Sequence, residues 1–260
     1  MKTVLKSTLA ALSLLCLPAI AQAEGALDAI AKSGVVKIAV PQDFPPFGSV
    51  GPDMKLRGCD IDMAELIAKA LGVKVEMVPV SSVNRIPYLT TGKVDMVISS
   101  LGKNPDREKV IDFTQAYLPF YLSVFGPADA AITTPAQLSG KVVGATRGSI
   151  EDLELTKMAP GDVVMKRYED NNSTIAAYLS GQVELMTTGN VVVNAVMEKN
   201  PPRKMFAKFV VKNSPVYVGI AKGDDALKAK INDIIAAAKA DGSLNAVSQK
   251  WLGAPLPGDL

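Results

Sequence analysis

The first half of the chain alternates short apolar runs with amphipathic segments. The β-branched run 35–40 predicts a buried strand. Apolar positions recur at helical spacing over 60–71 and Gly72 follows as a C-cap, so this segment predicts a helix. Strands that alternate with helices in this way indicate a parallel sheet with helices on both faces. The series continues with a strand at 73–78, a helix at 84–91 and a strand at 94–99.

The same rhythm restarts in the second half of the chain. The two series are alike in topology, although no sequence repeat relates them. We therefore expect two similar α/β units, at roughly 24–115 and 125–212. The second series consists of strands at 141–145, 163–166 and 183–187 and helices at 149–158, 173–179 and 190–199.

Two extended apolar stretches join these units. One covers 117–125, and the other covers 216–221 and leads into helices at 225–240 and 243–251. Because the chain has to cross between the units twice, this order predicts a bilobed α/β protein with a two-strand hinge and a cleft. The expected division is a first lobe of 24–117 plus 218–260 and a second lobe of 118–217.

The N-terminus has the pattern of a secretory signal peptide over residues 1–23. Lys2 and Lys6 form a basic start, an apolar run follows, and Ala21-Gln22-Ala23 offers small residues for cleavage after Ala23. A membrane anchor is the alternative, but the apolar run is well short of the ~20 residues that a membrane span needs. Cys16 raises a lipoprotein alternative, which the preceding Leu14-Leu15 disfavours because a small residue is usual there. These features predict export to the periplasm.

The composition excludes several kinds of chemistry. The chain has no histidine, so it has no Ser-His-Asp or Cys-His triad and no His-ligated zinc site. Removal of the signal leaves Cys59 as the one cysteine, which is expected to be a buried residue near a helix start rather than half of a disulfide. Lys2 and Lys6 account for the net charge of +2, so the mature chain is formally neutral. We expect no metal, no cofactor and no nucleic-acid partner.

Several blocks of sequence resemble the extracellular solute-binding proteins, family 3, which serve polar amino-acid ABC transporters in the periplasm. The most specific block is a strand that ends in small polar residues, followed by Pro-Asp-Arg and an Ile-Asp-Phe-Thr-x-x-Tyr run. The resemblance implies a type II periplasmic-binding-protein fold, with a mostly parallel sheet flanked by helices in each lobe. It also implies a monomer that delivers its ligand to a membrane permease. The matching segments are 41–47, 57–76, 86–117, 138–152, 179–190 and 239–253.

The resemblance places a carboxylate site at the end of the strand expected at 94–99. Arg107 falls where the family has the arginine that binds the ligand's α-carboxylate. Ser99, Ser100 and Gly102 precede it, at the strand end where open α/β sheets bind ligands. A carboxylate removed from water needs charge-assisted donors, which these residues supply. The alternative is that Arg107 is a solvated loop residue.

Three further positions are expected at the ligand. Ser149 follows Gly148 at a helix N-terminus, where free N–H groups favour an anion, and it is also an ordinary N-cap. Phe44 matches an aromatic residue that packs over the ligand in the family, although it also suits packing within its own loop. Arg85 precedes Ile-Pro as in the glutamate- and aspartate-binding members, where an arginine faces the ligand side chain. The alternative for Arg85 is a helix surface.

One departure from the family affects the ligand. The family usually has an aspartate after the strand expected at 183–187, and it neutralises the ligand's α-ammonium group. Here Gly189 or Asn190 takes that place, and Asn190 can accept a hydrogen bond but cannot pair a charge. A buried ammonium without a counter-ion is costly. Either Asp43 or Glu151 substitutes for the missing aspartate, or the ligand is an organic acid without an α-amino group.

The sequence therefore favours a solute receptor for a small carboxylate, such as a polar or acidic amino acid. A secreted dehydratase acting on a cyclic carboxylated precursor of phenylalanine is a second interpretation, because some enzymes of that kind resemble this family. Such an enzyme needs a carboxylic acid in the cleft, and Glu151 is the candidate. A glutamate in the first turn of a helix is also an ordinary structural feature, so we expect no catalytic residue here.

Overall fold

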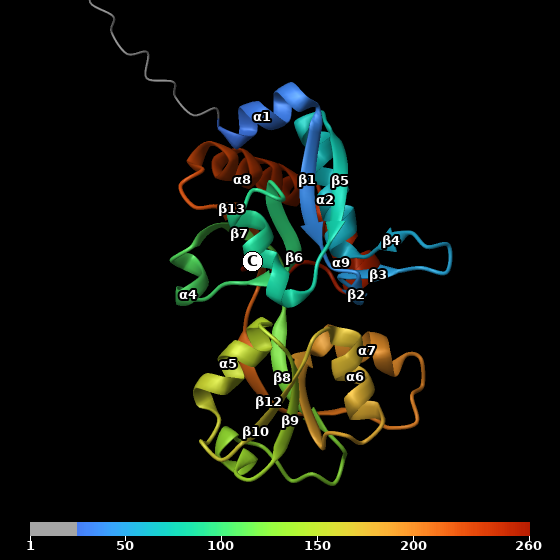
Figure 1. The fold of residues 1–260 in the computed structure, drawn as a ribbon. Coiled ribbons are helices and arrows are strands. Elements are labelled where there is room, and N and C mark those ends of the chain that lie inside the picture. The colour runs from blue at the N-terminus through green and yellow to red at the C-terminus, as the bar shows by residue number, and fades with distance from the viewer. Residues whose placement is uncertain (1–24) are drawn as a thin grey trace, which may run out of the picture.

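The computed structural model describes residues 25–260, which form two lobes, one above the other (Figure 1). Two segments connect the lobes. One runs from Leu118 to Tyr121 and the other from Asn213 to Val216, and the backbone N–H of Ser214 donates to the carbonyl of Phe120 at 2.8 Å. This hydrogen bond ties the two crossing segments together at the hinge.

The first lobe is built on a five-stranded sheet of order β5-β1-β6-β13-β7. Its first three strands are parallel, and β13 is antiparallel to both of its neighbours, so four strands run in one direction and β13 runs in the other. The sheet is mostly parallel, as the alternating pattern predicted. The strands are β1 (Val35–Val40), β5 (Lys74–Pro79), β6 (Met96–Gly102), β7 (Ile111–Leu118) and β13 (Val216–Ala221).

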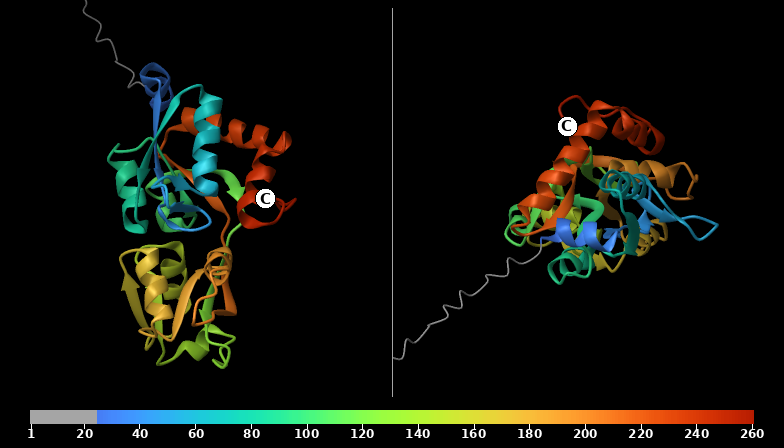
Figure 2. Two further views of the ribbon diagram at one scale, coloured as in Figure 1. Left: turned by 90° about the vertical axis from the view of Figure 1, so that its right-hand side faces the viewer. Right: turned by 90° about the horizontal axis from the view of Figure 1, so that it is seen from above.

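Helices cover both faces of this sheet. Val36, Ile38 and Val40 of β1 are completely buried in one apolar cluster with residues of α2 and α8, whereas Ala39 belongs to the cluster on the α3 side. Helices α8 and α9 contact each other on the first lobe, at an angle that Figure 2 shows. The helices are α1 (Ala26–Ser33), α2 (Cys59–Leu71), α3 (Arg85–Thr90), α4 (Pro105–Glu108), α8 (Asp225–Ala240) and α9 (Ser243–Leu252), with a 3-10 turn at Ser82–Asn84 and a small antiparallel sheet of β2 (Asp43–Phe44), β3 (Gly48–Val50) and β4 (Leu56–Arg57).

The second lobe repeats the arrangement in a sheet of order β10-β9-β11-β8-β12. Here β8 is the reversed strand, and β10, β9 and β11 are parallel neighbours. The elements are β8 (Tyr121–Gly126), a 3-10 turn at Pro135–Leu138, β9 (Val142–Thr146), α5 (Ile150–Met158), β10 (Val164–Tyr168), α6 (Asn171–Leu179), β11 (Leu185–Gly189), α7 (Asn190–Met197) and β12 (Phe206–Asn213).

The structure differs from the expected elements mainly at the hinge and the edges. The stretch 117–125 is two strands rather than one, because Pro119 and Phe120 separate β7 from β8. The sequence pattern missed α1, the β2–β4 sheet, α4, the part of β7 before residue 117 and β12. Cys59 is free and buried as the first residue of α2, which confirms the expectation for it.

The predicted signal peptide, 1–23, lies outside the described residues, and the predicted lobe boundaries remain a proposal. Within 25–260, no helix is both long and apolar enough to span a bilayer.

Candidate functional site

The predicted carboxylate site lies where strand β6 ends, facing the second lobe. Asn104 is the N-cap of α4, and its Oδ1 accepts the backbone N–H of Arg107 at 2.9 Å. This cap begins a short helix directly after the strand, and Pro105 follows at its first position, where proline is tolerated. The local sequence thereby turns the side chain of Arg107 back toward the end of β6.

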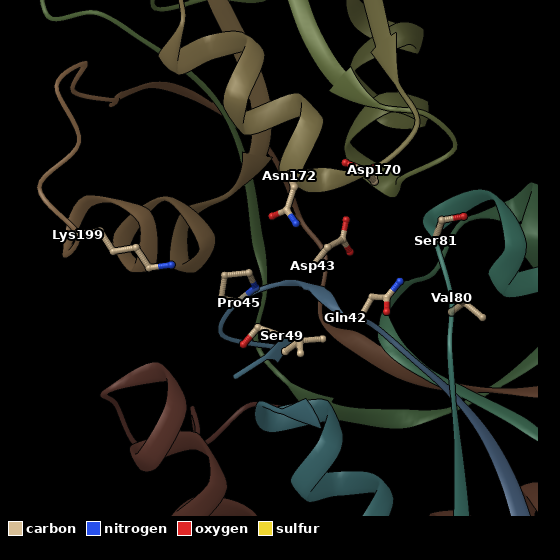
Figure 3. Close-up of a pocket in the computed structure, with 10 residues that line it drawn as sticks. Gln42, Asp43, Pro45, Ser49, Val80, Ser81, Asp170, Asn172 and Lys199 are labelled. Atoms are coloured by element: carbon tan, nitrogen blue, oxygen red, sulfur yellow. The ribbon is translucent and has the colours of Figure 1, made fainter. Parts of the chain in front are cut away.

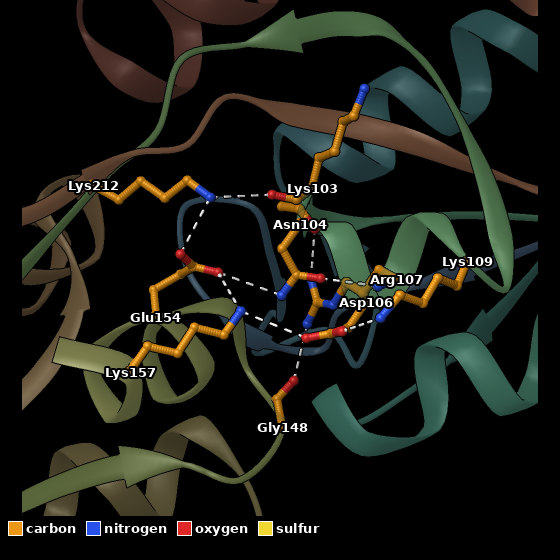
Figure 4. Close-up of polar contacts among 10 residues, drawn as sticks. Lys103, Asn104, Asp106, Arg107, Lys109, Gly148, Glu154, Lys157 and Lys212 are labelled. Atoms are coloured by element: carbon orange, nitrogen blue, oxygen red, sulfur yellow. Dashed lines mark hydrogen bonds and ion pairs between the residues drawn. The ribbon is translucent and has the colours of Figure 1, made fainter.

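Arg107 bridges the two lobes (Figure 4). Its Nη1 donates to the carbonyl of Gly102 at 2.6 Å, and its Nη2 donates to the carbonyl of Gly148 in the second lobe at 3.0 Å. Arg107 is only 5% exposed, so the solvated-loop interpretation is wrong. Burial lowers the pKa of its guanidinium to about 10, and the neighbouring charge of Arg85 acts in the same direction.

Arg85 is a second buried arginine of the first lobe. It is 3% exposed, so the helix-surface interpretation is also wrong. Its Nε donates to the Oγ of Ser99 at 3.0 Å, and its Nη2 lies 3.5 Å from the Oγ of Ser100. Burial lowers the pKa of Arg85, and the carboxylates of Glu151 and Asp60 oppose that shift. The predicted residues Arg85, Ser99 and Ser100 are therefore in direct contact.

Glu151 enters the same region from the second lobe. It lies in the first turn of α5, is 4% exposed, and carries a pKa raised by burial. The positive charges of Arg85 and Arg107 both act to lower that pKa. Ser149 is the N-cap of α5, and its Oγ accepts the backbone N–H of Asp152 at 3.2 Å. The N-cap interpretation of Ser149 is thus confirmed, and its contact with a ligand remains a prediction.

A further carboxylate lies behind the arginines, on the first-lobe side. Asp60 is fully buried near the start of α2, where its Oδ2 accepts the backbone N–H of Ser100 at 2.6 Å and its Oδ1 accepts the hydroxyl of Tyr117 at 2.7 Å. Burial raises the pKa of Asp60 to about 7, while these two hydrogen bonds and Arg85 act to lower it. Sequence reasoning missed Asp60, because its partners lie 40 and 57 residues away.

Asp43 makes a second polar bridge between the lobes. Its Oδ2 accepts the backbone N–H of Asn171 at 2.7 Å, and its Oδ1 accepts the side-chain Nδ2 of Asn171 at 3.1 Å. Asn171 is the first residue of α6, so Asp43 satisfies a free N–H at a helix N-terminus. Asp43 therefore helps to hold the two lobes together.

A polar pocket of about 420 Å³ opens beside this bridge (Figure 3). Both lobes line it. The first lobe contributes Gln42, Asp43, Pro45, Ser49, Val50, Val80 and Ser81, and the second contributes Asp170, Asn172 and Lys199.

An aromatic cluster fills the hinge side of the site. The ring of Phe44 stacks on Phe47 with centroids 5.8 Å apart and meets Phe120 edge-on at 6.0 Å. Phe44 is 3% exposed, so packing within this cluster accounts for its burial. A Cβ at Gly189 would overlap the ring of Phe120. Gly189, the last residue of β11, therefore has no room for a side chain unless this ring moves, whereas the next residue, Asn190, carries one.

Asn190 starts α7 next to this cluster. Its Oδ1 is buried and has no hydrogen-bond partner within the described part of the chain. A buried amide oxygen without a partner costs free energy unless something donates to it. Asn190 is therefore compatible with its predicted role as an acceptor.

Charged side chains join the lobes along the outer edge of α4 and α5 (Figure 4). Glu154 accepts from the Nδ2 of Asn104 at 3.4 Å, and it pairs with Lys212 at 3.4 Å. Lys157 lies 3.6 Å from Asp106. The side chains of Lys157 and Asp106 are more than half exposed, so this ion pair contributes little stability on its own, whereas Glu154 and Lys212 are partly buried. No group of His, Cys, Asp and Glu in 25–260 is arranged to hold a metal ion.

Comparison with known proteins identifies the family. The model of the bacterial extracellular solute-binding proteins, family 3, matches residues 36–254. The L-cystine-binding protein TcyJ of Escherichia coli K12 is 26% identical over 233 residues, which are 89% of this chain and 87% of that protein.

Two solved structures are similar in fold and sequence. The solute receptor for L-cysteine of Neisseria gonorrhoeae has a TM-score of 0.81 and 31% identity, covering 87% of this chain and 93% of that one. The ancestral amino acid-binding protein AncCDT-1, a precursor of cyclohexadienyl dehydratase, has a TM-score of 0.79 and 28% identity, covering 87% and 99%. The family match spans nearly the whole described chain, and this protein belongs to the bacterial extracellular solute-binding proteins, family 3.

Proposed function

We propose that this protein is the periplasmic receptor of an ABC importer and that it binds a small polar or acidic amino acid between its lobes. The observation that carries this proposal is the pair of buried arginines, Arg85 and Arg107, at the meeting of the two lobes. In this proposal residues 1–23 are a cleaved signal, the protein acts as a monomer, and a membrane permease receives the ligand.

Arg107 is the proposed partner of the ligand's α-carboxylate. Its guanidinium N–H groups already point to carbonyl oxygens of both lobes, those of Gly102 and Gly148. A carboxylate makes stronger hydrogen bonds to a guanidinium than a neutral carbonyl does, and it can accept two at once. A ligand held here contacts both lobes, so it stabilises the arrangement in which they meet.

Arg85 is the proposed partner of a second ligand group. Its guanidinium contacts the hydroxyls of Ser99 and Ser100, and its positive charge interacts with that of Arg107. Two buried cations near one another repel, and an added anion between them relieves that repulsion. An acidic side chain on the ligand supplies such an anion, which favours glutamate or aspartate over neutral amino acids.

Glu151 is the proposed partner of the α-ammonium group. Asp43 already accepts two hydrogen bonds from Asn171, whereas Glu151 is buried beside both arginines. The carboxylate of Glu151 can therefore neutralise an ammonium group that enters with a carboxylate on Arg107. This role would replace the aspartate for which the ring of Phe120 leaves no room at Gly189.

The same steric observation favours a second candidate, a receptor for an organic acid without an α-amino group. Phe44, Phe47 and Phe120 pack against one another on the hinge side, so this part of the site supplies no carboxylate for an ammonium group. In this case Glu151 balances the arginine charges and does not contact an ammonium group. We further propose that the protein is not an enzyme, which requires that it leaves prephenate unchanged.

A thermal-shift screen of the mature chain from residue 24 tests these alternatives. The panel pairs acids that differ by one group, namely L-glutamate with glutarate, L-aspartate with succinate, and L-glutamate with L-glutamine. A ligand that binds the folded state raises the midpoint. A shift with L-glutamate that is larger than with glutarate and L-glutamine supports the acidic amino acid, and a larger shift with glutarate supports the organic acid.

The Arg85→Ala variant should lose more of the L-glutamate shift than of the L-glutamine shift. If no acid or amino acid in the panel shifts the midpoint, the receptor proposal fails, and consumption of prephenate would favour a dehydratase instead.

A further inference from the structure

Asp60 connects three elements of the first lobe at the floor of the site. It belongs to the first turn of α2, and its two oxygens accept hydrogen bonds from Ser100 at the end of β6 and from Tyr117 in β7. Each bond is shorter than 2.8 Å, and the residue is completely buried. The carboxylate therefore has one fixed position relative to the strand end that carries the predicted ligand-binding residues.

Ser100 has an unusual backbone at this point. Its φ is +39°, in the left-handed region that residues with a side chain rarely adopt. Such a conformation persists where the surroundings hold it, and it often marks a functional site. The short hydrogen bond from the Ser100 N–H to Asp60 is a contact that holds it here.

The turn at Ser100 sets the position of the side chains beside it. Ser99 and Ser100 both contact the guanidinium of Arg85, and the carbonyl of Gly102 accepts from Arg107 two residues further on. A change in the Ser100 backbone would therefore move the groups that hold both arginines. Asp60 has no need to touch a ligand in order to affect its binding.

We propose that Asp60 is a positioning residue of the solute site, whose ionised carboxylate fixes the backbone of Ser100 and, through it, the places of Ser99 and Arg85. This inference rests on the proposed receptor function, and it adds a residue that acts through others. It also makes ligand affinity depend on pH, because only the ionised carboxylate offers a charged acceptor to both Ser100 and Tyr117.

The charged and titratable groups around Asp60 come from several elements. Cys59 precedes it in α2, Tyr117 lies in β7, and Arg85 faces it from α3. Glu151 from α5 and Asp43 from β2 act on Arg85, and Asp62 acts on Cys59. Burial raises the pKa of Asp60 to about 7, and the hydrogen bond from Tyr117 is the largest effect in the opposite direction. The residue therefore changes charge in the neutral pH range.

Calorimetric titration with L-glutamate and with glutarate, at pH values between about 5 and 9, tests the proposal. The proteins are the wild type, Asp60→Asn and Tyr117→Phe, with Tyr178→Phe as the matched control because its hydroxyl donates to a backbone carbonyl in the second lobe. Glu151→Gln removes the other buried carboxyl of the site. Melting of each protein without ligand confirms that it is folded.

We expect wild-type affinity to fall as the pH drops through about 7. Asp60→Asn should bind about tenfold more weakly above that pH and show no transition. Tyr117→Phe should move the transition to higher pH, because it removes the hydrogen bond that lowers the pKa of Asp60. Tyr178→Phe should keep both the affinity and the transition of the wild type, whereas Glu151→Gln should bind L-glutamate more weakly without moving the transition.

A wild type whose affinity does not change with pH, or an Asp60→Asn variant with wild-type affinity and pH profile, overturns the positioning role alone. If Asp60→Asn does not fold, an unmoved transition in Tyr117→Phe overturns it equally. A wild type that binds neither acid at any pH overturns the proposed acidic ligand and this inference with it, which separates the two kinds of failure.

Discussion

Arg107 of the first lobe donates a hydrogen bond to the carbonyl of Gly148 in the second lobe, at 3.0 Å. The same guanidinium donates to Gly102 at the end of β6, so one side chain joins the two surfaces that a ligand would touch. Because the group is 5% exposed, an anion bound to it is also removed from water, where its hydrogen bonds to Arg107 are stronger. In the proposed receptor, ligand binding and the contact between the lobes therefore depend on the same residue.

The bridge between Asp43 and Asn171 should favour the arrangement in which the lobes meet. Asp43→Ala removes two hydrogen bonds to a carboxylate, and we expect a loss of about 1–3 kcal/mol from the closed arrangement. Ligand affinity should fall by roughly tenfold or more, and small-angle scattering should show a larger radius of gyration. Asp53→Ala is the control, because its half-exposed carboxylate pairs with Arg57 within the first lobe. Equal ligand affinity in both variants would show that the bridge between Asp43 and Asn171 does not stabilise the closed arrangement.

Glu151→Gln should distinguish ligands that carry an α-ammonium group from those that do not. Loss of the carboxylate leaves a buried ammonium without a counter-ion, so affinity for L-glutamate should fall by at least about tenfold. Affinity for glutarate should stay the same or rise, because a negative charge near Arg85 and Arg107 is gone. Calorimetry with both acids on both proteins measures the difference. A parallel loss for the two acids would contradict the role of Glu151 at the ammonium group.

The raised pKa of Asp60 should appear in the stability of the protein without ligand. The folded-state pKa is about 7 against 3.8 for the free carboxyl, so between these values the folded state binds more protons than the unfolded state. Stability should therefore decrease as the pH rises from about 4 to about 7, by on the order of 4 kcal/mol at most. Asp60→Asn should lack this component. Urea unfolding at a series of pH values checks it, and identical slopes in both proteins would contradict it.

The elements with the strongest local patterns were predicted closely, and those fixed by distant contacts were not. The apolar runs of β1 and β13 and the helix α8 have the residue ranges that their patterns predicted. β12 was missed because it lies at the edge of its sheet with one buried residue, and its pairing with β8 defines it. An edge strand of this kind has no alternating pattern to reveal it.

The site also combines features that local sequence predicts with features that depend on distant contacts. The resemblance to the family drew attention to Arg107, and local sequence explains its position, because Asn104 and Pro105 begin the helix that carries it. The role of Asp60 depends on contacts with Ser100 and Tyr117 that only the folded sheet creates. Likewise, the lack of an aspartate at Gly189 was visible in the sequence, but the ring of Phe120 that fills the space beside this glycine was not.

Gly189 should not tolerate a side chain. A Cβ at this position overlaps the ring of Phe120, so Gly189→Ala should destabilise the protein by roughly 1–3 kcal/mol through overpacking. Gly161→Ala is the matched control, because no atom lies within 4 Å of its Cβ. Thermal unfolding of the two variants gives the comparison. A Gly189→Ala variant as stable as the control would show that Phe120 moves aside easily and that an aspartate could fit there.

The most direct test of the central claim is calorimetric titration of the mature protein and of Arg107→Gln with the strongest ligand from the acid panel. Arg147→Gln serves as the control, because this arginine pairs with Glu169 at the surface of the second lobe and is half exposed. We expect saturable binding of one ligand to the wild type and to Arg147→Gln, and a loss of at least about a hundredfold in affinity for Arg107→Gln. Undiminished binding by Arg107→Gln would contradict the claim that this arginine holds the ligand between the lobes.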